Sequence, residues 1–250
     1  MKHGRQYDTL VINGENLTLE DVRDVAVDGR KIAIAADARE RMEESYALVG
    51  EILRSGEPVY GISTGFGEFS RVHLSDDQNV QLQLNLIRSH ASGTGKPFDE
   101  KTVRAIMLLR LNALCVGFSG INPDIADLLV SFLNLGVTPI IPEQGSLGAS
   151  GDLANLAHMS LVLIGEGRAT VDGIEMDGRE ALARRNLNPV RLCGKDGLAL
   201  INGTAVMLGV GTLAYLEAED VLHAANGAAA LTFEALHGFR GAYDRRIHEL

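Results

Sequence analysis

The chain has 250 residues, of which 46% are hydrophobic and 22% charged, a composition that excludes intrinsic disorder and collagen-like repeats. Its 33 acidic and 23 basic side chains give a net charge of −10, so no basic face is offered to a phosphate backbone and nucleic acid is not an expected partner. The two cysteines, Cys115 and Cys193, lie far apart in the sequence, which argues against a disulfide scaffold or a zinc site and favours a reducing, cytoplasmic location.

Helical periodicity dominates the sequence, and we expect a mainly α-helical fold. The elements expected, in chain order, are a strand over 9–13, helices over 32–53, 76–91, 99–116, 123–135 and 152–164, a hairpin over 169–176, and helices over 197–225 and 229–237. Pro123 at a first helical position and Gly136 just past a last one are typical helix boundaries. The hairpin turn is assigned to Asp172-Gly173, a dipeptide that favours tight turns between strands.

No segment of the sequence is predicted to be a secretory signal or to span a membrane. No apolar run follows the charged start of the chain, so no secretory signal is predicted. The longest uncharged run, 198–216, reaches membrane-spanning length, but Asn202, Thr204 and several glycines interrupt it. This pattern favours a helix in a protein core, and no membrane partner is expected.

Glycines gather in four short segments rather than in one linker. The segments are 61–67, 93–95, 117–120 and 145–151. Because glycine is most useful where the backbone turns sharply or approaches another segment closely, we expect tight loops between helices at these places. Loops held by rigid helices are common locations for catalytic residues.

Three weak motifs favour structural rather than catalytic interpretations. Residues 61–65 match the G-x-S-x-G pattern of serine hydrolases, but the sequence that follows continues as a loop instead of a helix. Residues 93–96 lack the full pattern of a phosphate loop and are expected to form a helix-ending turn. His158 lies in an apolar helix, where a hydrogen-bonded core histidine is expected, and no close pair of ligands predicts a metal site.

The segment 145–153 contains three consecutive small residues, Ala149, Ser150 and Gly151, followed by a helix that Ser150 or Asp152 would cap. Such a tripeptide can condense with itself when a tight turn compresses it. The backbone nitrogen of Gly151 attacks the carbonyl carbon of Ala149, and loss of one water closes a five-membered ring. Loss of a second water, which carries away the Ser150 hydroxyl, leaves an exocyclic methylene that is a strong electrophile.

Five motifs together resemble the histidine and aromatic amino-acid ammonia-lyase family, in its order and at its spacing. They are Y-G-I-S-T-G-F-G at 60–67, S-H-A-S-G-T-G at 89–95, G-F-S-G at 117–120, G-S-L-G-A-S-G-D-L at 145–153, and G-L-A-L-I-N-G-T at 197–204. The resemblance implies a fumarase/aspartase-like helical lyase fold, with small β elements near the N-terminus and at the 169–176 hairpin. One departure is Asn155, where many members have proline, and little consequence is expected from it.

The resemblance also implies roles for individual residues. Ala149, Ser150 and Gly151 would form 4-methylidene-imidazole-5-one autocatalytically, with no metal or external cofactor. Tyr60 would be the base that removes the Cβ proton, which requires a site that stabilises phenolate because a free tyrosine has a pKa near ~10. Asn202 would hydrogen-bond the prosthetic group or the substrate amine, although a plain interhelical hydrogen bond is an alternative. The residues implied to support these are Gly67, Ser89 and Asp152.

The pair Ser89-His90 resembles the histidine-selective members, in which His90 would contact the substrate imidazole. Members selective for tyrosine tend to have His-Leu at this place, and those selective for phenylalanine Phe-Leu. The resemblance therefore implies elimination of ammonia from L-histidine to give trans-urocanate, the first step of histidine degradation. A tyrosine or phenylalanine ammonia-lyase, or a 2,3-aminomutase of the same family, is the alternative.

Members of the family are much longer than this chain and work as homotetramers whose active sites combine several subunits. Residues 1–250 resemble their N-terminal half, with the prosthetic-group loop and the start of the central helical bundle, and we expect the C-terminal half to be missing. A chain of this kind by itself would expose helix faces that are normally buried, which predicts association or poor solubility. A catalytically inactive N-terminal fragment is therefore a competing hypothesis.

Overall fold

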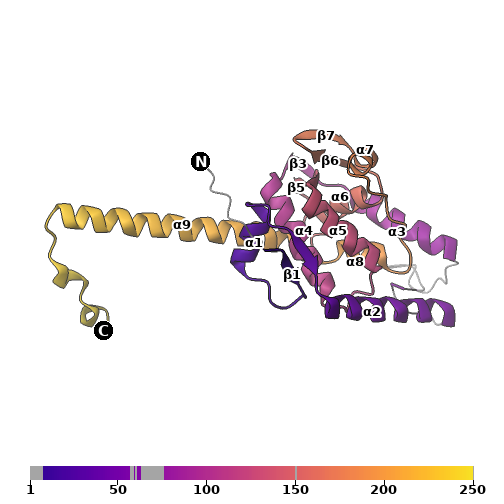
Figure 1. The fold of residues 1–250 in the computed structure, drawn as a ribbon, viewed down its shortest axis with the longest axis horizontal. Coiled ribbons are helices and arrows are strands. Elements are labelled where there is room, and N and C mark those ends of the chain that lie inside the picture. The colour runs from indigo at the N-terminus through magenta and orange to yellow at the C-terminus, as the bar shows by residue number, and fades with distance from the viewer. Residues whose placement is uncertain (1–7, 57–58, 60, 63–75, 150, 250) are drawn as a thin grey trace. The chain divides into compact units, whose positions relative to one another are not determined.

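The computed structural model describes residues 8–56, 59, 61–62, 76–149 and 151–249 (Figure 1). The chain divides into two compact units, Met1–Thr212 and Leu213–Leu250. Among the described residues helices predominate and the strands are only three or four residues long, which confirms the mainly α-helical prediction.

The first unit begins with two parallel strands, β1 (Leu10–Ile12) and β2 (Ile32–Ile34), joined through helix α1 (Leu19–Ala26). The strand expected over 9–13 is confirmed, but the helix expected from residue 32 is wrong at its start. Residues 32–34 form β2 because Ile-Ala-Ile can pair with β1, and α2 (Ala36–Ser55) begins only afterwards. Sequence periodicity cannot reveal this pairing, since the partner strand is about 20 residues away in the chain.

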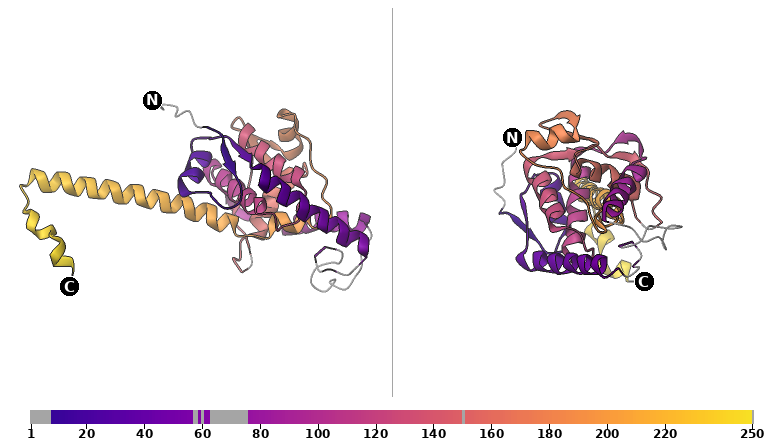
Figure 2. Two further views of the ribbon diagram at one scale, coloured as in Figure 1. Left: turned by 60° about the horizontal axis from the view of Figure 1, so that its bottom comes forward. Right: turned by 90° about the vertical axis from the view of Figure 1, so that its right-hand side faces the viewer.

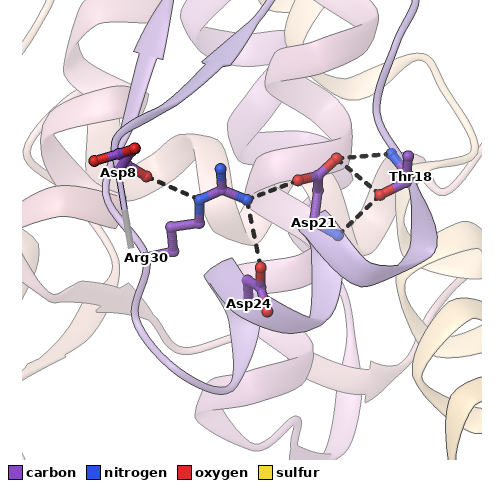
Figure 3. Close-up of polar contacts among 5 residues, drawn as sticks. All are labelled: Asp8, Thr18, Asp21, Asp24 and Arg30. Carbon is purple, nitrogen blue, oxygen red and sulfur yellow. Dashed lines mark hydrogen bonds and ion pairs between the residues drawn. The ribbon is translucent and has the colours of Figure 1, made fainter. Parts of the chain in front are cut away.

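Helix α1 was not predicted, although its sequence contains a capping box (Figure 3). The Thr18 Oγ1 accepts a hydrogen bond from the Asp21 backbone N–H at 3.1 Å, and the Asp21 carboxylate accepts one from the Thr18 N–H at 3.2 Å. Arg30, on the loop leading to β2, pairs with Asp21 at 2.8 Å and Asp24 at 3.3 Å and donates to the Asp8 carbonyl. These contacts attach α1 to the strand pair.

Helix α4 (Glu100–Cys115) lies at the centre of one group of helices. It packs against α1, α2 and α5 (Pro123–Leu135), and its residues from Val103 to Leu111 are all buried. In Figures 1 and 2, α2 lies at the border of this group. The predicted ends of α5 are confirmed, because Pro123 is its first residue and Gly136 follows it with a left-handed φ of 69°.

A second group consists of α3 (Asp76–His90), α6 (Leu153–Leu163) and α8 (Asp196–Ile201), which pack on one another. Two antiparallel strands, β3 (Thr94–Pro97) and β5 (Pro142–Gln144), connect the end of α3 to the segment that precedes α6. Residues 94–97 are thus a strand rather than the expected helix-ending turn, because β5 supplies hydrogen-bonding partners. His90 ends α3, Asp152 directly precedes α6, and Asn202 directly follows α8.

A three-stranded antiparallel sheet in the order β4-β6-β7 includes the predicted hairpin. Its strands are β4 (Val137–Pro139), β6 (Arg168–Val171) and β7 (Ile174–Asp177). Asp172 and Gly173 have φ values of 52° and 76°, so both turn residues are left-handed, as a tight hairpin turn requires. The short helix α7 (Gly178–Arg184), which was not predicted, follows β7 directly.

The prediction of a single helix over 197–225 is wrong. Helix α8 ends at Ile201, and α9 (Ala205–Ala235) begins after a turn over 202–204. The separate helix expected over 229–237 is instead the end of α9. Among the described residues, the stretch Asp196–Ala235 is long and apolar enough to cross a membrane, by length and composition alone. Core helices of soluble proteins meet the same test, and 44% of the most apolar window of this stretch is buried.

The second unit, Leu213–Leu250, contains the later part of α9 and two short 3-10 helices, η2 (Arg240–Tyr243) and η3 (Arg245–His248). Phe233 and Tyr243 stack edge to face, with ring centroids 5.2 Å apart and an interplanar angle of 87°. Several large apolar side chains of this unit are exposed, among them Val221, Leu222, Leu231 and Phe239. This exposure agrees with the prediction that the chain presents helix faces suited to burial.

Candidate active site

His90 is the last residue of α3, and its ring is oriented by the preceding turn of the helix. Its Nδ1 lies 2.8 Å from the Leu86 carbonyl oxygen. Because a carbonyl oxygen can only accept, Nδ1 carries the proton in a neutral ring and Nε2 is left as an acceptor. The Ser89 Oγ donates to the same carbonyl at 3.1 Å. The half-buried His90 therefore offers a hydrogen-bond acceptor beyond the end of α3.

The loop after His90 reaches the segment that precedes α6. The Gly93 N–H donates to the His158 Nε2 at 3.0 Å, and burial lowers the pKa of His158, so a neutral ring accepts this bond. The interpretation of His158 as a hydrogen-bonded histidine is thereby confirmed. Strand pairing places Thr94 opposite Gln144, and a side chain at Gly145 would lie 3.2 Å from the Gly93 Cα. Two of the glycine-rich segments thus meet backbone to backbone.

The loop over 145–151 is closed by hydrogen bonds at its base. The Ser146 Oγ donates to the Asp152 carboxylate at 2.6 Å and accepts from the Gly148 N–H at 3.2 Å. Ala149 is exposed. Ser150 lies outside the described residues, so the structure describes the two neighbours of this serine and not the serine itself.

Asp152 is completely buried and connects three segments of the site. Its backbone N–H donates to the Gly203 carbonyl at 2.7 Å, and its carboxylate accepts from the Val206 and Met207 N–H groups at 2.8 and 2.9 Å. The expectation that Asp152 caps its own helix is therefore wrong for the side chain. Asp152 occupies the N-cap position of α6, but its carboxylate satisfies the free N–H groups at the start of α9 instead.

Gly151 lies directly against the turn between α8 and α9. Its φ is 145°, and a Cβ there would lie 2.7 Å from the Gly203 nitrogen and 2.8 Å from the Gly203 oxygen. Only glycine fits this backbone contact. Asn202 precedes Gly203, is exposed, and has no side-chain hydrogen bond to another described residue. No described residue is thus a partner for the alternative role of Asn202, an interhelical hydrogen bond.

Two buried polar residues that sequence analysis missed support α8 from neighbouring helices. The Gln83 Oε1, on α3, accepts from the Gly197 N–H at 2.9 Å and the Leu198 N–H at 3.4 Å. Arg110, on α4, donates to the Ala199 carbonyl, and its guanidinium group occupies the space a side chain at Gly203 would need. Burial lowers the pKa of Arg110 to about 10. For Arg110 the available signal was a charged side chain within an apolar helical run, whereas Gln83 lies among other polar residues of α3 and offered none.

The start of α8 is also held by Asp196, which is completely buried. Its carboxylate accepts from the Asn122 N–H at 2.8 Å and the Cys193 N–H at 2.9 Å. Burial raises the pKa of Asp196 to about 6. The Cys193 Sγ lies 3.0 Å from the Tyr46 hydroxyl, and burial raises the pKa of both groups, so they stay neutral while Asp196 titrates.

Comparison with known proteins shows the family of this chain. The family model described as aromatic amino acid lyase matches residues 17–250. The chain belongs to the aromatic amino acid lyase family. It is 56% identical over 240 residues to a histidine ammonia-lyase of Treponema denticola, covering 96% of this chain and 47% of that relative. It is 47% identical to one of Geobacillus thermodenitrificans, covering 96% and 48%. The chain thus spans about half the length of these curated relatives.

Solved structures of this family share the fold. A histidine ammonia-lyase from Trypanosoma cruzi superposes with a TM-score of 0.90 at 33% identity, over 96% of this chain and 47% of that one. An ergothionase from Treponema denticola gives a TM-score of 0.87 at 33% identity, over 93% and 47%. A tyrosine aminomutase from Streptomyces globisporus gives 0.77 at 41% identity, over 82% and 39%. The predicted helical lyase fold is confirmed.

Several residues implied by the family resemblance lie outside the described part of the chain, namely Tyr60, Gly67 and Ser150. Next to Tyr60, the Ile62 N–H donates to the Val59 carbonyl at 3.1 Å, and the Ile62 carbonyl accepts from the Asn79 Nδ2 at 2.9 Å. The segment flanking Tyr60 is therefore attached to α3, the helix that ends at His90.

Asn155, which departs from the proline of many family members, is completely buried in α6. Its Nδ2 donates to the Pro142 carbonyl at 2.6 Å, while its Oδ1 has no partner among the described residues. This side chain joins the start of α6 to β5, which is a structural rather than a chemical role. The expectation of little consequence stays a prediction.

Proposed function

We propose that the enzyme to which this chain belongs eliminates ammonia from L-histidine to give trans-urocanate, in the first step of histidine degradation. The observation that carries the proposal is the contact of Gly151 with Gly203, which brings the end of the Ala149–Gly151 tripeptide to the turn that carries Asn202. The 56% identity to a histidine ammonia-lyase over 96% of the chain supports the same reaction.

His90 accounts for the choice of histidine. With its Nδ1 proton directed at the Leu86 carbonyl, its Nε2 can accept a hydrogen bond from the N–H of a substrate imidazole. A phenyl ring has no such donor, so phenylalanine would leave this acceptor unpaired. Mismatches of this type discriminate strongly between substrates because a desolvated polar group without a partner is costly.

The residues present fit 4-methylidene-imidazole-5-one formed from Ala149, Ser150 and Gly151. The φ of Gly151 and the absence of room for a Cβ there suit a tightly bent backbone, and Asp152 anchors the tripeptide on its C-terminal side. The group would supply an electrophile that captures either the amine or the aromatic ring of the substrate. No metal or external cofactor is needed for this chemistry.

The chain's own residues would act around this electrophile. Tyr60, as a phenolate, would take the Cβ proton, and Asn202 would orient the amine through its exposed amide group. Asp152 would hold the loop by its bonds to Gly203 and to the start of α9. Gly67 and Ser89 would support the loops that carry the base and the imidazole-binding residue.

The curated relatives that the chain matches are about twice its length. We propose that residues 1–250 form the N-terminal lyase part, including the start of a central helical bundle, and that the enzyme is a cytoplasmic homotetramer. The exposed apolar side chains of the second unit would be covered in such an assembly.

A fusion enzyme tests the proposal. It joins this chain to the part of the Treponema denticola histidine ammonia-lyase that the chain does not match. We expect the fusion to convert histidine to urocanate, to prefer histidine over tyrosine and phenylalanine, and to show an intact mass lower by two waters. A preference for tyrosine, or a β-amino acid product, would indicate an aminomutase or another lyase of the family. An unmodified mass without turnover would indicate an inactive fragment.

A further inference from the structure

Gln83 caps a helix to which it does not belong. Its side chain is 1% exposed, and its Oε1 accepts from the first N–H groups of α8, those of Gly197 and Leu198. These groups have no partner within their own helix, so an acceptor must come from elsewhere. The contact is close, since a Cβ at Gly197 would lie 2.9 Å from both the carbonyl oxygen and the Oε1 of Gln83.

The face of α3 that contains Gln83 contacts other parts of the site as well. Asn79 lies one turn before Gln83 and donates to the Ile62 carbonyl beside Tyr60. His90 lies seven residues after Gln83, which places all three side chains on one face of the helix. One rigid helix therefore contacts the segment next to Tyr60, carries His90, and holds the start of α8.

Helix α8 is short enough to transmit this contact to Asn202. It spans only Asp196–Ile201, so Asn202 lies about 8 Å along the axis from Gly197 at a rise of 1.5 Å per residue. A helix of six residues has fewer than two turns, so its first turn adjoins the turn that precedes Asn202. Asn202 follows its last residue directly and is separated from Gly151 only by the contact at Gly203.

We propose that Gln83 is a positioning residue for the reaction, which sets Asn202 relative to His90 by fixing the first turn of α8 to α3. This inference rests on the proposed function of Asn202 and His90. Gln83 touches neither substrate nor prosthetic group in this proposal. It acts through backbone N–H groups of α8, and its removal would displace the amide of Asn202 while leaving His90 and the Ala149–Gly151 loop in place.

The kinetic test compares Gln83→Met with two controls in the fusion enzyme. Gln83→Met keeps the length of the side chain and removes the acceptor, and we expect kcat for histidine to fall about 100-fold, as for a displacement of about 1 Å at a reacting group. KM should change much less, since His90 stays in place. Gln83→Glu retains an acceptor and should restore most of kcat. Gln81→Met, which changes an exposed glutamine on the same helix whose one side-chain hydrogen bond to a described residue is to Asn85, should leave kcat unchanged.

A double-mutant cycle separates positioning from a general structural role. In an Asn202→Ala background, Gln83→Met should lower kcat by no more than about twofold, because the group it positions has been removed. Independent, multiplicative losses would overturn the proposal. Equal losses in Gln83→Met and Gln81→Met, or a change in KM alone, would overturn it as well.

Amide hydrogen exchange tests the contact without any turnover. In the 250-residue chain, the Gly197 and Leu198 amides should exchange at least about 100-fold faster in Gln83→Met than in the unmodified sequence, if the lost bond is worth about 3 kcal/mol. Unchanged protection would overturn the inference even if histidine is turned over. Faster exchange without histidine turnover would instead count against the proposed function. If Gln83→Met fails to fold, Gln83→Asn replaces it in each experiment. The asparagine side chain is shorter by one methylene, so its amide oxygen lies farther from the α8 N–H groups.

Discussion

The turn over 202–204 and the β6–β7 hairpin are both short polar connections, but different forces hold them. Buried groups from α3, α4 and α6 bind the backbone around the turn, through Gln83, Arg110 and Asp152. The hairpin is held by strand pairing, including that of β6 with β4, by buried apolar side chains such as Val171, and by exposed ion pairs such as Arg168–Glu175. Buried hydrogen bonds to the backbone leave costly unpaired groups when they are removed, whereas exposed ion pairs contribute little. We therefore expect the proposed site to depend on the turn and to tolerate change in the ion pairs of the hairpin.

The largest effect is expected from Gly151→Ala. The new Cβ would lie 2.7 Å from the Gly203 nitrogen, and the φ of 145° is unfavourable for alanine, so the free energy of unfolding should fall by about 4 kcal/mol. Gly148→Ala is the matched control in the same loop. Among the described residues, its Cβ would meet only the Met207 sulfur, at 3.6 Å, and the loss should stay near 1 kcal/mol. Urea unfolding of both variants measures the difference, and equal losses would show that the contact with Gly203 is unimportant.

Asp152→Ala should cost about 3 kcal/mol, because the Val206 and Met207 N–H groups lose their buried acceptor. Asp177→Ala is the control, since Asp177 is also an N-cap aspartate but is exposed and makes no side-chain capping bond. Its loss should stay below about 0.5 kcal/mol. Urea unfolding checks the pair, and similar losses would contradict the special role of the start of α9.

Asp196→Asn should alter the pH dependence of stability. Burial raises the pKa of the Asp196 carboxyl from 3.8 to about 6, so between these values the folded chain retains a proton that the unfolded chain releases. The contribution of Asp196 is therefore fully present below pH 4 and is lost as the pH rises through 6. Relative to Asp196→Asn, the original chain should lose about 2 kcal/mol between pH 4 and 7. Parallel stability curves for the two proteins would contradict this assignment.

The smallest effect is expected in the hairpin. Glu175→Gln removes the Arg168–Glu175 pair, whose side chains are 60% and 47% exposed, and the free energy of unfolding should change by less than about 0.5 kcal/mol. The change in this free energy of unfolding with salt concentration should be equally small. A loss of more than about 2 kcal/mol would erase the contrast between the hairpin and the turn.

Local signals were sufficient wherever an element depends mainly on its own residues. Pro123 and Gly136 marked the ends of α5, and Asp172-Gly173 marked the hairpin turn. The capping box at Thr18 was an available signal for α1 that periodicity alone did not use. In contrast, β2 and the break after Ile201 depend on partners distant in the chain, and the sequence interpretation failed at both.

The residues of the site also divide into those that local signals indicate and those that depend on distant partners. Motifs alone predicted that Ala149, Gly151 and Asn202 take part in one chemistry, because the prediction used only residue types and their order. That Asp152 caps α9 rather than α6, and that Gln83 caps α8, could not be read from spacing.

The amino-acid sequence by itself determined the helical class and the family, because side-chain chemistry and helical period are properties of short segments. It also led to the proposal of which residues form the electrophile. Only the tertiary structure decided where the buried hydrogen-bonding groups find their partners. A buried N–H must be satisfied, but which distant oxygen satisfies it depends on how the helices pack. That choice places the turn bearing Asn202 against Gly151.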